Sequence, residues 1–237
     1  MVSLSDIYRY LAVQCRVENR VGKGVQGFVT ISRQSGSAGI AVGEKLGLYL
    51  NEHLPGECPW TVFNKNLVDE IIKDHNLSSS VIPFLEEKAV PEIEEMLEEL
   101  LGVHPPQSIL VRDTNDTIIR LAKMGHVIIV GHGAAVITNK IPGGVHVRLV
   151  GSLKKRKDST KESLKCNDKE AEDIIYKEDK GRRGYLKQNF GKDIDDPLLY
   201  DLVINTDLVS LIQAASLIGS LVIQKVCNLT KGEIPCQ

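Results

Sequence analysis

The chain has 237 residues, 42% of them hydrophobic and 25% charged, which suffices for a globular core that needs no disulfide or metal support. A net charge of −2, 5% aromatic residues and charges of mixed sign argue against a nucleic-acid binder and a membrane-surface protein. No apolar run reaches the roughly 18 residues of a membrane span, and the N-terminus lacks a signal-peptide core, so we expect a cytoplasmic protein. Five scattered cysteines without a C-x-x-C pair are expected to be free thiols: Cys15, Cys58, Cys166, Cys227 and Cys236.

The first half of the chain predicts helices that alternate with short strands. We expect these elements at residues 4–20 (an amphipathic helix), 28–32 (a buried strand), 39–51 (a helix), 60–63 (a strand) and 77–102 (a helical insert). Asn64 can cap a further helix after the second strand. Glutamates in the insert oppose an apolar stripe, which indicates a solvated surface rather than a catalytic or metal site. The apolar stripe of the first helix leaves two interpretations open, packing on the core or on a second subunit of a homodimer.

The second half continues the alternation. We expect a helix at 108–124, strand, turn and helix across 126–138, a strand at 145–150, two charged helices within 152–190, a strand at 201–206, a helix at 208–226 and a loose tail at 227–237. Each of the five strands is a short continuous hydrophobic run, which is typical of a parallel sheet covered on both faces. The sequence therefore predicts the α/β class, as a three-layer α/β/α domain with a five-stranded parallel sheet.

The segments that follow the predicted strands should meet at one place. In open parallel sheets, ligands bind at the carboxyl ends of the strands. These ends are the segment 32–39, Asn64, the segment 131–133, Arg148 and the segment 205–207. We therefore expect one crevice that these segments form together.

The first of these segments resembles a phosphate-binding loop. Glycines permit close approach of the backbone, and successive N–H groups at a helix start supply hydrogen-bond donors. The residues that we expect to contact phosphate are Arg33, Ser35, Gly36, Ser37, Ala38, Gly39, Ile40 and Ala41. The alternative is that Gly36 and Gly39 only shape a strand-to-helix turn.

Charge is distributed unevenly along the chain. Residues 154–192 contain 13 Lys or Arg and 8 Asp or Glu, a local charge of +5, whereas the remainder has 16 against 23, or −7. The excess fits either a solvated helical face or a basic flap over phosphates.

Five motifs, in order from about residue 28 to 225, resemble the cytidylate kinase-like family of the P-loop nucleoside monophosphate kinases. They are VTISR with GSAG (29–39), VIIVGHGAAVI (127–137), VRLVGSLKKR (147–156), YKEDKGRRGYLKQNFG (176–191) and DDPLLYDLVINTD (195–207). The resemblance does not cover the first 26 residues.

The resemblance implies a P-loop NTPase-type fold and transfer of the γ-phosphoryl group of ATP, with Mg²⁺, to a nucleoside monophosphate, CMP or dCMP being the family expectation. It divides the chain into an N-terminal extension (1–26), a kinase-like domain (27–226) and a tail (227–237). Within the domain, the core comprises 27–63, 106–152 and 193–226, a helical acceptor insert comprises 64–105, and a basic lid comprises 153–192. The expected partners are small nucleotides.

The lid contains the catalytic candidates that the resemblance implies. Asp179 and Arg182 match the family's Asp-x-x-Arg, and one helical turn separates them, so the acid can orient the guanidinium. Arg183 is adjacent, and Arg156 matches another family arginine. The alternative for Asp179 and Arg182 is an ordinary surface ion pair. Arg148, at the end of a strand, is expected to be structural if it is not part of the site.

Several positions depart from the family pattern. Gly39 stands where the phosphate-binding lysine of a P-loop would be, and Ala41 stands where a hydroxyl would hold Mg²⁺. Relatives have Asp at Asn64 and an arginine at His132. The residues expected to bind substrate are Asn64, Gly131, His132 and Gly133. No protein ligand for a metal is predicted.

The departures leave three functions open. The first is an active nucleoside monophosphate kinase, in which Arg182, Arg183 or Arg33 replaces the missing lysine. The second is a weak or inactive nucleotide-binding protein, because the loss of one charge-stabilising donor costs roughly 10²- to 10³-fold in rate. The third is a kinase for a small molecule that is not a nucleotide.

Overall fold

The computed structural model describes residues 27–55, 58–64 and 107–230. The strands are β1 (Phe28–Arg33), β2 (Thr61–Phe63), β3 (Val127–Val130), β4 (Gly144–Val150) and β5 (Leu202–Asn205). The helices are α2 (Gly39–His53), α6 (Gln107–Met124), α7 (Ala134–Ile137), α8 (Leu153–Leu164), α9 (Asp168–Phe190) and α10 (Leu211–Thr230), with a short 3₁₀ turn, η2, at Pro197–Leu199. The predicted elements within these ranges are therefore present.

The five strands form one parallel sheet in the order β2-β3-β1-β4-β5. β1 is central, and its register places Ile31 beside Val130 of β3 and Ser32 beside Arg148 of β4. The chain leaves β1 for α2 at the same edge where it leaves β3 for α7 and β4 for α8. This shared edge brings three of the predicted segments together, as expected for a parallel sheet.

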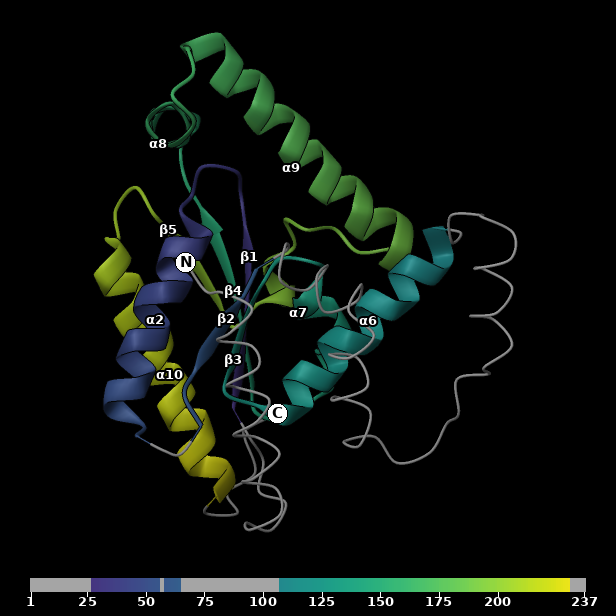
Figure 1. The fold of residues 1–237 in the computed structure, drawn as a ribbon, viewed down its shortest axis with the longest axis vertical. Helices are drawn as coiled ribbons and strands as arrows, with labels where there is room; N and C mark the ends of the chain where they lie inside the picture. Colours follow the sequence, from purple (N-terminus) through teal and green to yellow (C-terminus); the bar gives the residue numbers. More distant parts are fainter. Residues whose placement is uncertain (1–26, 56–57, 65–106, 231–237) are drawn as a thin grey trace, which may run out of the picture.

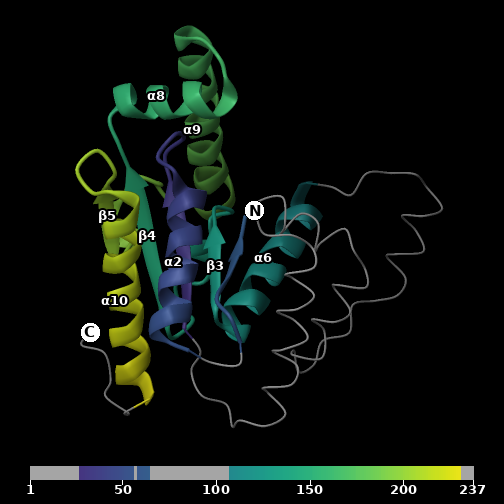
Figure 2. The ribbon, with the colours of Figure 1, turned by 60° about the vertical axis from the view of Figure 1, so that its left-hand side comes forward.

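Helices cover both faces of the sheet, so the predicted three-layer α/β/α class is confirmed. Figures 1 and 2 show α2 and α10 together on one face and α6 with α7 on the other. Val42, Leu46 and Leu50 of α2 recur every four residues and are completely buried against the sheet. Apolar side chains of α6, such as Ile118 and Leu121, fill the second core on the opposite face. Continuous hydrophobic strands are required here because both faces of the sheet are covered.

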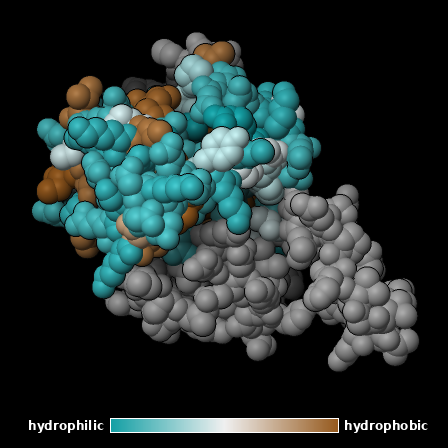
Figure 3. Space-filling view, turned by 90° about the horizontal axis from the view of Figure 1, so that it is seen from above, coloured by the Kyte–Doolittle hydropathy of each residue, from teal (hydrophilic) through white to brown (hydrophobic). Residues whose placement is uncertain are grey.

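Helices α8 and α9 lie above the carboxyl ends of the strands (Figure 1). Ser152 caps α8, and Asn167 with Glu170 forms a capping box that starts α9. The side of the molecule seen from above is mainly hydrophilic (Figure 3), as the charged composition of this segment predicts. These two helices lie within residues 153–192, which the family resemblance assigns to a lid, and we call them the lid helices; their function as a lid stays a prediction.

The closing helix and the tail need correction, and three other expected elements lie outside the described residues. The closing helix starts three residues later than predicted and continues to Thr230, so residues 227–230 are helical and not a loose tail. The helix over 4–20, the helix capped by Asn64 and the insert over 64–105 lie outside the described residues, apart from Asn64 itself. Cys58 and Cys166 are free thiols, as expected. Among the helices described, none is long and apolar enough to cross a membrane.

Candidate functional site

The loop between β1 and α2 is a tight turn built on left-handed backbone. Gly36 has φ +78°, and Ala38, which precedes α2, has φ +56°. The buried Ser37 hydroxyl donates to the Gln34 carbonyl at 2.7 Å. The first N–H groups of α2 have no acceptor within the helix, which is the arrangement that favours anions at a helix start. The backbone of this turn could therefore accommodate an anion, whereas its role as a phosphate-binding loop stays a prediction.

The lid helices contact this loop directly. The Ser35 N–H donates to Asp179 Oδ1, and the Ser35 hydroxyl donates to Glu178 Oε2, both at 2.7 Å. Arg156 Nη1 donates to the Ser35 carbonyl at 3.1 Å. A side chain at Gly36 would overlap the Arg156 carbonyl, so α8 packs against the loop backbone. Two carboxylates of α9 thus occupy hydrogen-bond donors of the loop.

Asp179 connects the two lid helices to the loop. Its Oδ2 accepts from Arg156 Nη1 at 2.7 Å, and its Oδ1 accepts from Arg182 Nη1 at 3.1 Å. Arg182 also donates to Glu178 at 2.6 Å. Burial opposes ionisation of Glu178, but the Ser35 hydrogen bond and the Arg182 charge outweigh it and lower its pKa. The predicted contact between Asp179 and Arg182 exists, whereas its catalytic role stays a prediction.

A second arginine network lies on the β4 side of the loop. Arg148 is almost completely buried, and its guanidinium donates to Ser32 at 2.9 Å and to Asp195 at 2.7 Å. Arg183 donates to the other oxygen of Asp195 at 2.6 Å. Although burial alone would raise the pKa of Asp195, the two arginines lower it. Arg148 and Arg183 are thus already paired with a carboxylate.

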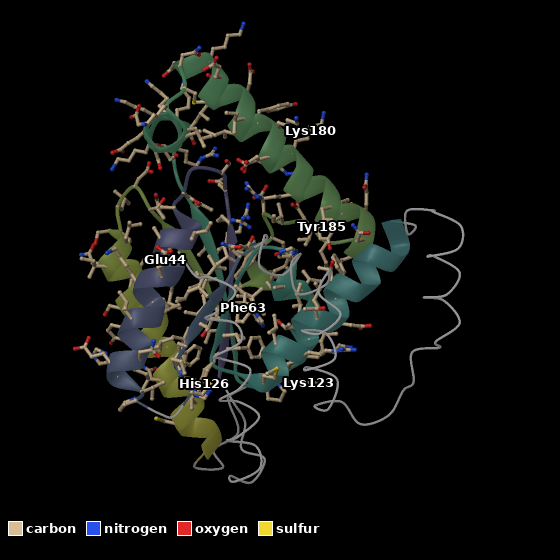
Figure 4. The ribbon with its side chains drawn as sticks, viewed as in Figure 1. Glu44, Phe63, Lys123, His126, Lys180 and Tyr185 are labelled. Atoms are coloured by element: carbon tan, nitrogen blue, oxygen red, sulfur yellow. The ribbon has the colours of Figure 1, made fainter. Side chains whose placement is uncertain are left out.

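A cavity of about 560 Å³ opens beside the loop. Its walls come from the ends of β1 and β3, from α7 and from α9, and include Arg33, Gly131, His132, Gly133, Arg182 and Tyr185. Figure 4 shows Tyr185 on the side of α9 that faces the sheet, whereas Lys180 lies on the opposite side. The size is in the range of small-molecule sites, and arginines concentrate where the cavity meets the loop.

The cavity floor depends on unusual backbone. Gly131, His132 and Gly133 follow β3 with φ of +105°, +56° and +71°. Glycine adopts this region without steric cost, whereas a residue with a side chain such as His132 is uncommon there. The turn lets the chain pass close to the cavity before α7 begins.

The structure brings most of the predicted site residues together. Arg33, Arg182, Gly131, His132 and Gly133 line the cavity. Arg183 instead lines a small adjoining hollow with Gln34 and Arg148, and Asn64, which ends β2, is not among the residues lining either space. Ile40 is 43% exposed at the start of α2.

Sequence reasoning missed four residues of the site. Glu178 and Asp195 hold arginines, and Tyr185 and Tyr200 form part of the cavity wall. The neighbouring motifs KEDKGRRGY and DIDDPLLY contained them, but no local signal separated them from other polar residues. Only their long-range contacts identify them.

The chain offers few ligands for Mg²⁺ at the loop. Ala41 has no side-chain oxygen, and the Ser37 hydroxyl is engaged with the Gln34 carbonyl. Within the described ranges, no group of three or more His, Cys, Asp or Glu side chains is arranged to hold a metal ion. Among the described residues, Glu178 and Asp179 are the carboxylates that accept hydrogen bonds from Ser35 of the loop.

Comparisons with known proteins agree with this architecture. A solved structure of an uncharacterized protein from Eubacterium ventriosum is similar, with a TM-score of 0.61 at 20% identity over 84% of this chain and 99% of that chain. This likeness shows the fold. The shikimate kinase of Bacteroides thetaiotaomicron (TM-score 0.43, 14% identity, 86% and 98% of the two chains) is too distant to carry an argument. A search of curated proteins gives no significant match.

The model of the cytidylate kinase-like family matches residues 28–208, which is most of the chain. The protein therefore belongs to the cytidylate kinase-like family.

Proposed function

We propose that this protein transfers the γ-phosphoryl group of ATP to a nucleoside monophosphate, CMP or dCMP being the acceptor that the family suggests. The observation that carries the proposal is the junction between the loop and the cavity. The loop ends at the start of α2, and the cavity of about 560 Å³ adjoins it with Arg33 and Arg182 at the boundary. A donor on the loop and an acceptor in the cavity would meet beside these arginines.

The chemistry fits the groups that are present. Phosphoryl transfer requires alignment of two negatively charged substrates and neutralisation of the charge between them, with little covalent work for the protein. Backbone N–H groups at the start of α2 supply donors for the ATP phosphates. Arg33 and Arg182 at the boundary of the cavity supply the neutralisation.

One observation favours a second candidate, a weak or inactive nucleotide-binding protein. Glu178 and Asp179 occupy the hydroxyl and N–H of Ser35, and Ala41 offers no hydroxyl for Mg²⁺. A nucleotide would have to displace these carboxylates before the loop could hold its phosphates. Binding without turnover is the expected behaviour of this candidate.

A phosphotransfer assay tests the proposal. ATP and Mg²⁺ are supplied with CMP, dCMP, UMP, AMP or GMP in turn, and the Arg182→Ala variant is compared with Lys180→Ala, whose side chain lies on the opposite side of α9 (Figure 4). We expect turnover with one acceptor and a loss of about 10²- to 10³-fold in kcat/KM for Arg182→Ala only.

The absence of turnover with every monophosphate would overturn the proposed transfer. Calorimetry with ATP on the same sample then decides between the candidates. Binding of ATP supports the nucleotide-binding protein, whereas turnover with a small alcohol acceptor in a wider screen supports a kinase for another substrate.

A further inference from the structure

Arg33 occupies the space that a lysine at position 39 would need. It is the last residue of β1, and its side chain runs across the start of α2. A Cβ atom at Gly39 would lie 3.0 Å from Cγ of Arg33 and 3.3 Å from its Cβ and Cδ. Such contacts are tighter than van der Waals packing normally allows. Glycine at position 39 therefore clears the path of the Arg33 side chain.

The guanidinium of Arg33 ends at the boundary of the cavity. A Cβ atom at Gly131, which follows β3, would overlap Nη1 of Arg33. Arg33 lines both the cavity and the small hollow next to Gln34 and Arg148. The aliphatic part of Arg33 thus passes Gly39, and its guanidinium lies beside Gly131, between the loop and the cavity.

Arg33 also differs from the other arginines of the site in its pairing. Arg148, Arg156, Arg182 and Arg183 each contact a carboxylate at 2.6 to 3.1 Å. Among the described residues, no carboxylate lies within ion-pair distance of Arg33. Its charge is only partly offset by the more distant Glu178 and Asp179. Within the described part of the chain, Arg33 is therefore a cation of the site that no carboxylate pairs directly.

The electrostatic environment agrees with this geometry. Burial and the nearby positive charge of Arg182 lower the pKa of Arg33 to about 10, so the guanidinium remains protonated at neutral pH. A desolvated cation without a direct partner is costly, and an anionic ligand removes that cost. A planar guanidinium can also donate to two phosphate oxygens at once.

We propose that Arg33 binds the phosphoryl group in transfer and replaces the lysine that phosphate-binding loops have at the position of Gly39, and that position 39 is a glycine because the Arg33 side chain needs its space. This assignment rests on the proposed function. A bond forms between an oxygen of the acceptor's dianionic phosphate and the γ-phosphorus, while the bond from phosphorus to the β–γ bridging oxygen breaks. ADP leaves with that electron pair, no proton is transferred, and Arg33 remains protonated throughout.

The first test separates a functional role from a structural one. Arg33→Met keeps most of the side-chain volume and removes the charge, and Lys180→Met removes a cation from the outer side of α9 as a matched control (Figure 4). We expect Arg33→Met to lower kcat/KM by about 10²- to 10³-fold. We also expect a melting temperature equal to or above that of the wild type, because the variant removes a partly buried charge that no described carboxylate pairs. A melting temperature several degrees lower would assign Arg33 a structural role and overturn the proposal.

The second test moves the cation back to the position of the usual lysine. Gly39→Lys alone should be nearly inactive, because the new side chain enters the space of Arg33. In the double variant Arg33→Ala/Gly39→Lys this clash is absent, and we expect at least tenfold recovery over Arg33→Ala. A double variant that is no better than either single variant would contradict the exchange of roles.

Binding measurements keep this inference distinct from the proposed function. If the wild type binds ATP but transfers no phosphoryl group, the proposed function is wrong. A tenfold or greater loss of ATP affinity in Arg33→Met would still support Arg33 as the phosphate-binding cation. If the wild type is active and Arg33→Met matches it in both turnover and ATP affinity to within threefold, the inference fails while the proposed function stands. A wild type that binds no ATP contradicts both.

Discussion

Arg33, on the cavity side of β1, has different surroundings from the arginines on the β4 side. On the β4 side, Arg148 and Arg156 are buried, and their guanidinium groups are taken up by carboxylates, a serine hydroxyl and backbone carbonyls. On the cavity side, Arg33 has no carboxylate of the described chain within ion-pair distance. A buried charge that is fully paired stabilises one arrangement of the fold, whereas a desolvated charge without a direct partner is poised to bind an anion. Substitutions on the two sides should therefore have different consequences.

The largest loss of stability is expected at Arg148. Arg148→Met removes the hydrogen bonds that Arg148 donates to Ser32 and Asp195. The Asp195 carboxylate then keeps only its contact with Arg183. We expect the free energy of unfolding to fall by about 3 kcal/mol, the lower end for breaking a buried pair, because Asp195 is partly exposed. Urea denaturation measures it. If Arg148→Met loses no more stability than Arg33→Met, the two sides do not differ as described.

The next largest effect is expected where the loop packs on α8. At Gly36, which has φ +78°, a Cβ atom would overlap the Arg156 carbonyl, so Gly36→Ala should lower the free energy of unfolding by about 2 kcal/mol. Gly184→Ala is the matched control, because nothing lies within 4 Å of a Cβ there and the position is inside α9. Alanine should raise helix stability at 184 by about 0.5 to 1 kcal/mol. Equal effects at the two glycines would show that the loop does not depend on α8.

The pH dependence of the free energy of unfolding should reflect the ionisation of Asp195 on the β4 side. The folded pKa of Asp195 is below its ordinary value, because hydrogen bonds from Arg183 and Arg148 outweigh the effect of burial. Ionised Asp195 therefore stabilises the protein above about pH 4, and this contribution is lost as the pH falls through the folded pKa. We expect Asp195→Asn to cost about 1 kcal/mol near pH 7, a figure reduced for solvent screening.

Denaturation of both proteins at pH 7, 5, 4 and 3 tests this expectation. The difference between the wild type and Asp195→Asn should be constant down to about pH 5 and should shrink below about pH 4. A difference that grows at low pH would have the wrong sign and would contradict the pairing of Asp195 with the two arginines.

Local patterns were enough to predict the sheet and the loop. Continuous hydrophobic runs identified all five strands, and the glycines between β1 and α2 identified the turn. The end of α10 was predicted too early, because the apolar periodicity stops at Val226 while the first stop signal, Gly232, comes later. Such errors at helix ends follow from the weakness of local termination signals.

Contacts between distant residues could not be predicted in the same way. Ser35 is 144 residues from Asp179 and 143 residues from Glu178, so no local pattern relates them. From the sequence, three arginines could replace the missing lysine: Arg33, Arg182 and Arg183. Only the folded chain shows that the Arg33 side chain fills the space at Gly39. It also shows that Arg182 and Arg183 are already paired with carboxylates. The types of residue in the site were predictable, but the distribution of charge among them was not.

The smallest effect tests the boundary between the two sides, where Glu178 accepts hydrogen bonds from the loop and from Arg182. If the carboxylate competes with phosphate for the Ser35 hydroxyl, Glu178→Gln should raise the affinity for ATP. The side chain is about half exposed, and partly exposed pairs are worth up to about 1 kcal/mol, so the gain should be about two- to fivefold. Calorimetry with ATP measures it, and Glu172→Gln, on the same helix but bonded to Lys157, is the matched control. A fall in ATP affinity for Glu178→Gln would mean that the carboxylate does not compete with the nucleotide. Glu178 would then orient Arg182 for nucleotide binding, and its role would be functional and not only structural.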